Sequence, residues 1–287
     1  MIATTIAEPV LTDQLLERVL IKLGLTERPE LDLAGLNTLC AAFSGNVSDD
    51  NIQKRIWFAG AQTTPVTGGD PNEFFENWRV HGTGGTCFPI NNALYTLARS
   101  IGFDARRIAG SMIVEGFEQD ANHGSVVVTL ERVDYLVDAQ LAAFKALPLV
   151  PGQAASTGEG IHDIKAVPVE DGFDVLWYAG HNREQPITFH PTQEYDPVDH
   201  AFFLTQYDLS RSNSRSPFNE SLYISRHFSD SILTLGRENK ITVASDNTVT
   251  TIELTDKERR RVLIEDFGVS EETVNALPPD VPGGIGF

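Results

Sequence analysis

The sequence predicts an α+β fold, in which a helical N-terminal third precedes a β-rich middle and a smaller α/β portion near the C-terminus. Three observations lead to this prediction. Apolar residues recur at helical spacing through roughly the first hundred positions. After Gly102, strand-length runs rich in Val and Ile replace that spacing. Near the end of the chain, Thr255 and Glu258 have the spacing of a capping box, which opens one more helix.

The N-terminal helices are predicted from apolar spacing and from residues able to cap them. Thr12 or Asp13 can cap the first helix, and Ser48 or Asp49 can cap the third. Pro89 falls in the first turn of the last one, where no intrahelical N–H is needed. The predicted helices cover residues 12–24, 31–43, 46–58, 72–80 and 87–101.

The rest of the chain is predicted to be mainly β-structure, with residues 148–172 as a loop rich in Pro, Gly and Ala. A further helix is expected at 194–210, with Asp196 as cap and Pro197 at its first position. The tail from residue 278 is expected to be extended or mobile. The predicted strands are residues 105–114, 123–130, 133–139, 173–180, 186–191, 222–228, 231–236, 240–245 and 248–254.

Composition excludes several classes of function. A net charge of −18 over 287 residues argues against a nucleic acid or an anionic membrane as the main partner. No window has the roughly 18 apolar residues that a membrane helix needs, and the first residues lack a signal-peptide pattern, so a cytoplasmic location is expected. Of two cysteines, Cys40 lies in an apolar helical run and is expected in the core. The histidines show no metal-ligand spacing, so no catalytic metal is expected.

Three residues in the centre of the chain have the chemistry and the order of a catalytic device. Cys87 follows Gly84 and Gly85 and opens a helix, and a helix N-terminus or an imidazolium stabilises the reactive thiolate. His123 begins one predicted strand and Asp138 ends the next, with a hairpin turn between them. If the first and last residues of this hairpin face each other, His123 contacts Asp138. The imidazole would then take the thiol proton, and the carboxylate would orient the imidazole.

These segments resemble the arylamine N-acetyltransferase family. That family is marked by RGGYCFELN, by a His opening a strand and by YLVDVGFG, where this sequence has TGGTCFPIN, NHGSVVV and YLVDAQLA. The resemblance implies Cys87 as the nucleophile, His123 as the base and Asp138 as the orienting acid. Weaker similarity extends to VSDDNI, which resembles the family's VPFENL, to the segment from Tyr207, and to the C-terminal helix, so it covers nearly the whole chain.

The resemblance implies a fold of the cysteine-proteinase type with three domains. These are a helical bundle at 1–101 with the nucleophile, an antiparallel β-barrel at 102–200 with the His and Asp, and a C-terminal α/β lid at 201–287. It also implies acetyl-CoA or another acyl-CoA as cosubstrate, bound between barrel and lid, and no tightly bound cofactor. Within the lid, the residues expected to contact CoA are Arg211, Ser212, Ser214 and Ser216, with Arg215 and Arg226 adding positive charge.

Around the three residues, the sequence departs from the family's pattern. Thr83 stands where the family has an Arg, and Pro89 stands where it has a Glu. In the family these two would form a buried charge pair. Since both are absent here, no unpaired charge is left behind. Thr86 replaces a Tyr. After the Asp, a glycine-containing segment of the family is replaced by Ala139, Gln140 and Leu141. The chemistry is therefore expected to be kept while the acceptor pocket differs.

The resemblance implies a ping-pong acyltransferase that moves an acetyl or short acyl group from acyl-CoA to a small-molecule amine through a Cys87 thioester. The chain is expected to act as a monomer or homodimer. Two other enzymatic functions stay open. One is an amide synthase of the same family, which joins an amine to a carrier-bound polyketide or peptide, and the other is a transglutaminase-like cysteine hydrolase. A binding protein on this fold is less favoured, because all three catalytic residues are present.

Overall fold

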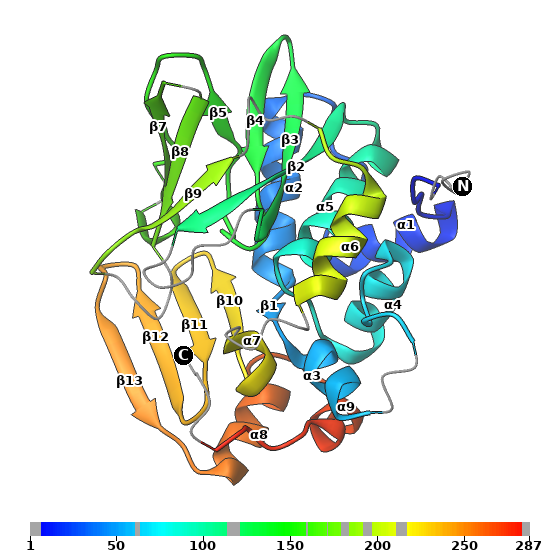
Figure 1. The fold of residues 1–287 in the computed structure, drawn as a ribbon, viewed down its shortest axis with the longest axis vertical. Coiled ribbons are helices and arrows are strands. Elements are labelled where there is room, and N and C mark those ends of the chain that lie inside the picture. The colour runs from blue at the N-terminus through cyan, green and yellow to red at the C-terminus, as the bar shows by residue number, and fades with distance from the viewer. Residues whose placement is uncertain are drawn as a thin grey trace.

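The protein has an α+β architecture, as the sequence predicts: helices gather along one side, and two antiparallel sheets occupy the other (Figure 1). This computed structural model describes residues 7–60, 64–113, 121–158, 160–170, 172–178, 184–191, 197–210 and 217–282. One sheet has eight strands and the other has five. Among the residues proposed from the sequence as functional, Cys87 opens a helix that packs against the strand beginning at His123.

The five N-terminal helices form as predicted, except that the third begins later. The side chain of Thr12 accepts the amide hydrogen bond that caps the first helix, and Asp32 and Asp70 cap the second and fourth. Ser48 and Asp49 cap nothing, because Asp49–Asp50 form a short strand, β1, that pairs with a strand far along the chain. The helices are α1 (Asp13–Lys22), α2 (Leu33–Asn46), α3 (Ile52–Ala59), α4 (Pro71–His81) and α5 (Cys87–Ile101).

The eight-stranded sheet is a nearly closed antiparallel barrel, because its two end strands, β5 and β6, lie against each other. The predicted loop at 148–172 is wrong, since β5, β6, a 3-10 turn (Gly160–His162) and β7 lie wholly or partly within it. In β7, buried Ile164 and Ala166 alternate with exposed residues, a strand pattern made inconspicuous by its Ala and Pro. In sheet order, the strands are β5 (Leu147–Leu149), β4 (Val133–Val137), β3 (His123–Leu130), β2 (Ala105–Ile113), β9 (Ile187–Pro191), β8 (Gly172–Trp177), β7 (Ile164–Val169) and β6 (Ala155–Ser156).

The hairpin of β3 and β4 forms as predicted, but its register differs from the expected one. Leu130 pairs with Val133 across a two-residue turn in which Glu131 and Arg132 both have positive φ, as a type I′ turn requires. Because β3 is longer than β4, pairing from this turn continues to place Ser125, not His123, opposite Asp138. His123 therefore meets Asp138 as a diagonal neighbour on the same face, which long side chains can span.

The five-stranded sheet combines one strand from the N-terminal part of the chain with four strands from the C-terminal part. Its edge strand β1 comes from the helical N-terminal part and pairs with β10, with Asp49 opposite Ser225. The predicted strands and the capping box of Thr255 and Glu258 are confirmed. In order, the sheet is β1, β10 (Ile224–Phe228), β11 (Ser231–Leu235), β12 (Asn239–Ala244) and β13 (Val249–Glu253), and the nearby helices are α7 (Pro217–Glu220), α8 (Asp256–Glu265) and α9 (Glu271–Ala276).

Helix α6 (His200–Ser210) begins later than predicted. Asp199, rather than the expected Asp196, accepts the amide hydrogen bond of Phe202 at its start, and Pro197 lies before the helix. Asp196 itself lies outside the described residues. The described part of the C-terminal tail, which reaches residue 282, is held to the fold. Asp280 forms ion pairs with Arg55 of α3 and Arg259 of α8. The structure does not test the predicted domain limits at residues 101 and 200, which stay a prediction.

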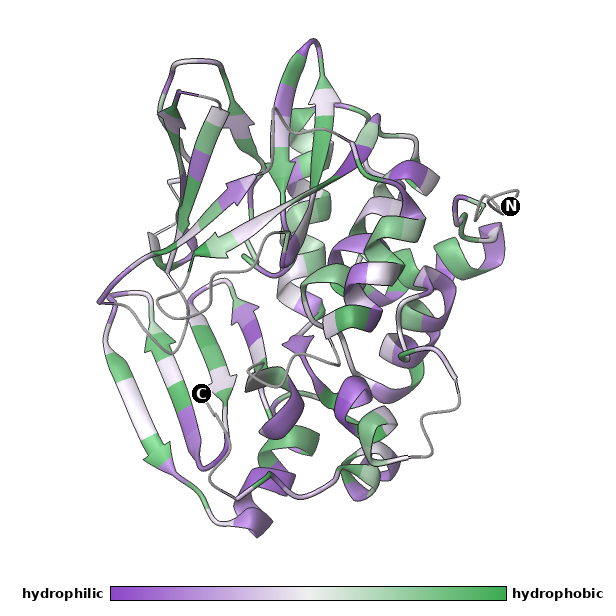
Figure 2. Cartoon of the chain, in the orientation of Figure 1, coloured by the Kyte–Doolittle hydropathy of each residue, from purple (hydrophilic) through white to green (hydrophobic). Residues whose placement is uncertain are grey.

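The core explains why β3 is apolar on both faces. Val126 and Val128 pack with the helices, whereas Val127 between them packs inside the barrel with Ile108 and Leu136. Figure 2 shows hydrophobic residues, in green, on strands of the barrel and along the helices beside them. His123, at the start of β3, therefore lies at the junction of the helical and barrel cores. Among the described residues, no helix has the length and apolar character needed to cross a membrane.

Candidate active site

Cys87 is the first residue of α5, and a tight turn holds it there. The amide of Gly84 donates a hydrogen bond to Oδ2 of Asp50 at 2.6 Å. A Cβ on Gly84 would lie 1.8 Å from the carbonyl oxygen of Ser48, so only glycine fits against β1. At a helix N-terminus the first amide groups have no intrahelical acceptor, and they favour negative charge nearby. Cys87 therefore lies beside backbone amides that lack intrahelical acceptors.

His123 and Asp138 are in direct contact, as the sequence predicts. The imidazole Nε2 lies 2.7 Å from Oδ2 of Asp138, and both residues are almost fully buried. The other carboxylate oxygen accepts hydrogen bonds from Nδ2 of Asn91 and from the amides of Gln140 and Leu141, at 3.0 to 3.2 Å. These contacts fix the carboxylate, which in turn fixes the plane of the imidazole.

Burial and charge together decide the protonation of this pair. Burial opposes a charged imidazole, but the charge and hydrogen bond of Asp138, with a further contribution from Cys87, raise the pKa of His123 to about 10. Burial likewise opposes ionisation of Asp138, yet the charge of His123 and the hydrogen bonds to the carboxylate hold its pKa below the usual value. Nε2 is taken by Asp138, Nδ1 has no hydrogen-bond partner among the described residues, and Sγ of Cys87 donates to the carbonyl oxygen of Asn122 at 3.7 Å. His123 and Asp138 thus form one electrostatic unit, and Cys87 lies within its range.

Besides His123 and the Asn122 carbonyl, Cys87 borders an apolar cluster and a buried lysine. The thiol packs beside a cluster that contains Trp57, Phe88 and Tyr207. The ammonium group of Lys54 donates to Oγ of Ser210 at 2.9 Å, and none of the described carboxylates forms an ion pair with it. Burial lowers its pKa to about 8, opposed by the negative charge of Cys87. Lys54 thus adds positive charge within electrostatic range of the thiol.

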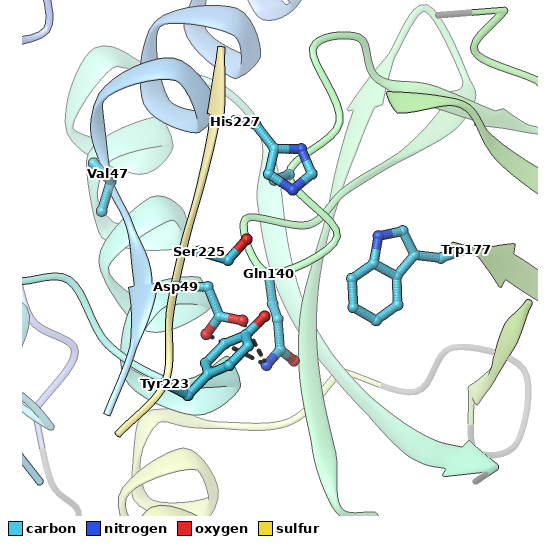
Figure 3. A pocket seen from close by; sticks show the side chains of 8 residues that line it. Val47, Asp49, Gln140, Trp177, Tyr223, Ser225 and His227 are labelled. Atoms are coloured by element: carbon cyan, nitrogen blue, oxygen red, sulfur yellow. Dashed lines mark hydrogen bonds between the residues drawn. The ribbon is translucent and has the colours of Figure 1, made fainter. Parts of the chain in front are cut away.

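A small cavity lined by both polar and apolar side chains lies between the barrel and the five-stranded sheet (Figure 3). Oxygen atoms of Asp49 accept hydrogen bonds from Nε2 of Gln140 at 3.3 and 3.5 Å. Ser225 lies in β10, Tyr223 directly precedes that strand, and Trp177 is the last residue of β8. The lining residues are Val47, Asp49, Gln140, Ala142, Trp177, Tyr223, Ser225 and His227.

The residues predicted to bind CoA are not tested by the structure. Arg211, Ser212, Ser214 and Ser216, together with Arg215, lie outside the described residues. Arg226 is described, and its guanidinium donates to the carbonyl oxygens of Gly45 and Phe267, so it ties α2 to the C-terminal part. Within the described ranges, no group of three or more His, Cys, Asp or Glu side chains is arranged to hold a metal ion.

Sequence reasoning missed the buried charges of β1 and α3. Asp49 and Asp50 were expected at a helix start, where an Asp is solvated, but both are buried against β10 and the glycine turn. Nothing in the sequence around these two adjacent acidic residues predicts that their side chains are buried. Gln140 was singled out as a departure from the family pattern, but not as a hydrogen-bond partner of Asp49.

Comparisons with known proteins bear on the family and the fold of this chain. A family model described as N-acetyltransferase matches residues 70–275. An "Uncharacterized acetyltransferase YvcN" of Bacillus subtilis (strain 168) is 30% identical over 157 residues, which are 50% of this chain and 57% of that protein. "Proansamycin X synthase" of Amycolatopsis mediterranei (strain S699) is 34% identical over 71 residues, 24% of this chain and 27% of that one. The chain thus spans little more than half of the first relative and about a quarter of the second.

A solved structure shares the fold along almost the whole chain. The arylamine N-acetyltransferase of M. smegmatis superposes with a TM-score of 0.78 at 16% sequence identity, covering 93% of this chain and 98% of that one. At this identity the similarity concerns the fold. It confirms the architecture implied by the sequence resemblance: helices, a barrel-like sheet and a C-terminal α/β part.

Proposed function

The chain belongs to the N-acetyltransferase family, and from this premise we propose that it transfers an acetyl or short acyl group from an acyl-CoA to an amine through a thioester on Cys87. One observation carries the proposal. A buried His123–Asp138 pair leaves one imidazole nitrogen free to serve a thiol that opens a helix. A thiol at a helix start, an imidazole and a fixed carboxylate are the parts that nucleophilic acyl transfer needs.

In the first half-reaction, the Cys87 thiolate attacks the carbonyl carbon of the acyl-CoA thioester. The bond from that carbon to the CoA sulfur breaks, and the His123 imidazolium returns a proton to the leaving thiolate. In the second half-reaction, an amine attacks the enzyme thioester, His123 accepts the proton of the amine, and the Cys87 sulfur leaves. Backbone amides of Cys87 and of the strand after His123 are the proposed oxyanion donors, each worth about 3–4 kcal/mol.

Acyl-CoA as donor rests on the family and on the segment 211–216, where Arg211, Ser212, Ser214 and Ser216 offer the charge and hydroxyl groups that bind phosphates. Lys54 lies at the described edge of that segment, because its partner Ser210 directly precedes it. A CoA phosphate in this place would meet positive charge despite the net charge of −18. The cytoplasmic location and the monomeric or homodimeric state expected from the sequence stay predictions.

Intact-mass spectrometry tests the first half-reaction. Incubation with acetyl-CoA is expected to add the mass of one acetyl group, which disappears in Cys87→Ser and persists in Cys40→Ser. Cys40 is the matched control, because its thiol is buried in the helical core. An adduct that survives Cys87→Ser, or none with any short acyl-CoA, would refute the proposal. Loss of the adduct in water without an amine would instead favour the hydrolase.

A second candidate function is an amide synthase acting on a carrier-bound acyl chain. It is favoured by the relative named as a synthase and by the departures around Asp138, where Gln140 now lines a small cavity. The chemistry at Cys87 would be the same, with a different acyl donor. Acylation by a carrier-protein thioester much faster than by acetyl-CoA would support this candidate.

A further inference from the structure

Asn91 is a buried side chain of α5 that contacts the chain beside both His123 and Asp138. Its Nδ2 donates hydrogen bonds to the carbonyl oxygen of Gly124 at 2.7 Å and to Oδ1 of Asp138 at 3.0 Å. Its Oδ1 accepts from the amide of Ala139 at 2.8 Å. Gly124 directly follows His123, and Ala139 directly follows Asp138. One fully buried amide group therefore connects α5 to the start of β3 and to the segment after β4.

Asn91 and Cys87 contact the same strand from one face of the helix. They are four residues apart in α5, so their side chains lie one turn apart on the same side. Sγ of Cys87 donates to the carbonyl oxygen of Asn122 at 3.7 Å. Nδ2 of Asn91 donates to that of Gly124, so the two accepting residues flank His123. The part of α5 that carries the thiol is thus aligned with His123 by two side-chain contacts.

A primary amide satisfies all three partners of this position at once. The carbonyl of Gly124 and the carboxylate of Asp138 require donors, whereas the amide of Ala139 requires an acceptor. An ionised carboxylate offers no donor, and an apolar side chain offers neither group. Removing the amide of Asn91 would leave a buried N–H and a buried C=O without partners. The hydrogen-bonding groups around this position therefore call for an asparagine.

The turn after Asp138 depends on such support, because residues 138–142 include no glycine. Ala142 lies in the left-handed region with a φ of 49°, which is unfavourable for a residue with a Cβ. A conformation of this kind persists where the surrounding contacts determine it. The amide of Ala142 donates to the carbonyl oxygen of Asp138 at 3.1 Å, and Asn91 holds Ala139 at the start of the turn. Asn91 thus helps to keep the turn and its carboxylate in place.

We propose that Asn91 is a positioning residue of this site, which fixes α5 against the β3–β4 hairpin so that the imidazole of His123 faces the thiol of Cys87. This inference rests on the proposed acyl transfer and adds a residue to that same site. In this role Asn91 acts through Asp138 and through the backbone of β3. Its replacement should therefore slow the acylation of Cys87 and leave the binding of acyl-CoA unchanged.

Asn92 provides a matched control, because it is the next residue of α5 and is also fully buried. Its Nδ2 also donates to two partners, the carbonyl oxygen of Gly69 and Nδ1 of His200. Its Oδ1 accepts from Nε of Arg107 at 2.8 Å. Asn92→Ala therefore removes the same kinds of hydrogen bond as Asn91→Ala, but away from the proposed triad. Both variants should lose a similar free energy of unfolding in urea.

Single-turnover acylation by acetyl-CoA, followed by intact mass, separates the two variants. Asn91→Ala should lower the maximum rate by about 100-fold, the loss that a misplacement of about 1 Å can cause. The acetyl-CoA concentration at half-saturation should stay unchanged. Asn92→Ala should keep the rate of the unmodified chain. Equal rates for the two variants, or a change confined to the half-saturating concentration, overturn the proposal.

Asn91→Asp keeps the shape of the side chain and serves if Asn91→Ala does not fold. When protonated, the new carboxyl group can donate to Asp138 and accept from Ala139, whereas its ionised form repels the Asp138 carboxylate. Its acylation rate relative to the unmodified chain should therefore fall as the pH rises from about 6 to 9. A rate equal to that of the unmodified chain at every pH overturns the proposal. The titratable groups around this position are Asp49, Cys87, His123 and Asp138.

Amide hydrogen exchange needs no acyl chemistry and separates this inference from the proposed function. In Asn91→Ala the amide of Ala139 loses its acceptor, so its exchange should become faster by about an order of magnitude. Asn92→Ala should leave that exchange unchanged. A missing acetyl adduct on the unmodified chain refutes the acyl transfer, while the exchange rates still report whether Asn91 holds the turn. Unchanged exchange at Ala139 in Asn91→Ala refutes the positioning role alone.

Discussion

At the scale of single residues, burial decides how the charged groups of this site behave. His123, Asp138, Asp49 and Asp50 are all buried, but only the first two form a pair of opposite charge. The pair ionises more readily than the isolated groups, with the pKa of His123 raised to about 10. Burial raises the pKa of the unpaired Asp50 to about 7. The protein interior therefore favours the charged forms of His123 and Asp138 and the neutral forms of Asp49 and Asp50.

The raised pKa of His123 predicts how its own imidazole titrates. Since the folded pKa is about 10, the imidazolium should persist between about pH 6 and 9. The NMR shifts of the His123 ring should therefore stay constant over this range, whereas a solvated imidazole titrates near pH 6.5. A His123 signal that titrates near pH 6.5 would contradict the ion pair.

The asparagine variant Asp138→Asn is the control for this experiment. The substitution keeps the shape and removes the charge that holds the imidazolium, so the pKa of His123 should fall and its ring should titrate within the measured range. Acyl transfer should fall by about three to four orders of magnitude, as it does where the orienting Asp of such a triad is replaced.

The contact of His123 with Asp138 could be predicted from the sequence, and the burial of Asp49 could not; the catalytic roles of Cys87, His123 and Asp138 stay a prediction. These three residues stand at local signals: a glycine turn before a helix, a strand start, and the end of a hairpin. Asp49 is buried because β1 pairs with β10, where Ser225 is its partner across the ladder. No property of the segment around residue 49 encodes that distant pairing, and a helix cap was the better local interpretation.

At the scale of elements, the two-residue strand β1 connects the five-stranded sheet to the turn before Cys87. It pairs with β10 on one side and bridges the glycine turn before Cys87 on the other. Asp50 adds two side-chain hydrogen bonds, accepting from the amides of Gly84 and Ile52 at 2.6 and 3.0 Å. One carboxylate thus fixes both the turn that presents the thiol and the start of α3.

Replacing Asp50 should destabilise the protein through these two amides. Asp50→Ala leaves both buried N–H groups without an acceptor, at a cost of about 2–4 kcal/mol in the free energy of unfolding. Asp50→Asn keeps one acceptor oxygen and should cost less. Urea denaturation measures both. Equal stability of Asp50→Ala and the unmodified chain would mean that water satisfies these amides.

Measurements at several pH values test the direction in which the stability difference between the unmodified chain and Asp50→Asn changes. The folded pKa of Asp50, about 7, lies above its usual 3.8, so ionising this group opposes folding as the pH rises between those values. The stability of the unmodified chain relative to Asp50→Asn should therefore decrease from about pH 4 to pH 7.

Elements with a strong local pattern were predicted and those with a weak one were not. The helix at Cys87–Ile101 and the hairpin of β3 and β4 have clear apolar periodicity and clear turn residues. The strands β5, β6 and β7 are short or contain Pro, and barrel closure rather than propensity holds them in the sheet. The diagonal contact of His123 and Asp138 depends on a register that strand lengths determine.

At the scale of the whole molecule, the C-terminal segment holds the N-terminal helices to the second sheet. Asp280 is largely buried and pairs with Arg55 at 2.7 Å and with Arg259, and it also accepts a hydrogen bond from the amide of Leu222. Arg55 further donates to the carbonyl oxygen of Pro279 at 2.9 Å. Three parts of the chain, α3, α8 and the start of β10, thus meet at one carboxylate.

Removing this carboxylate should destabilise the fold by about 3–5 kcal/mol, because the buried Arg55 is left unpaired. Thermal and urea denaturation of Asp280→Ala measure the loss. The matched control is Asp256→Ala, since Asp256 pairs with the same Arg259 but is 92% exposed, and it should cost about 0.5 kcal/mol or less. Similar losses in both variants would mean that the buried cluster contributes no more than a surface pair.

The pairing of β1 with β10 also has a consequence for the order in which the enzyme is made. During synthesis, Asp49 and Asp50 leave the ribosome long before β10 (Ile224–Phe228), and a non-local pairing must wait for its partner. Cys87, His123 and Asp138 are all present by then. A nascent chain that stops before β10 therefore carries the proposed triad without the wall formed by Tyr223, Ser225 and His227. The proposed catalytic residues are therefore translated well before the strand that completes their surroundings.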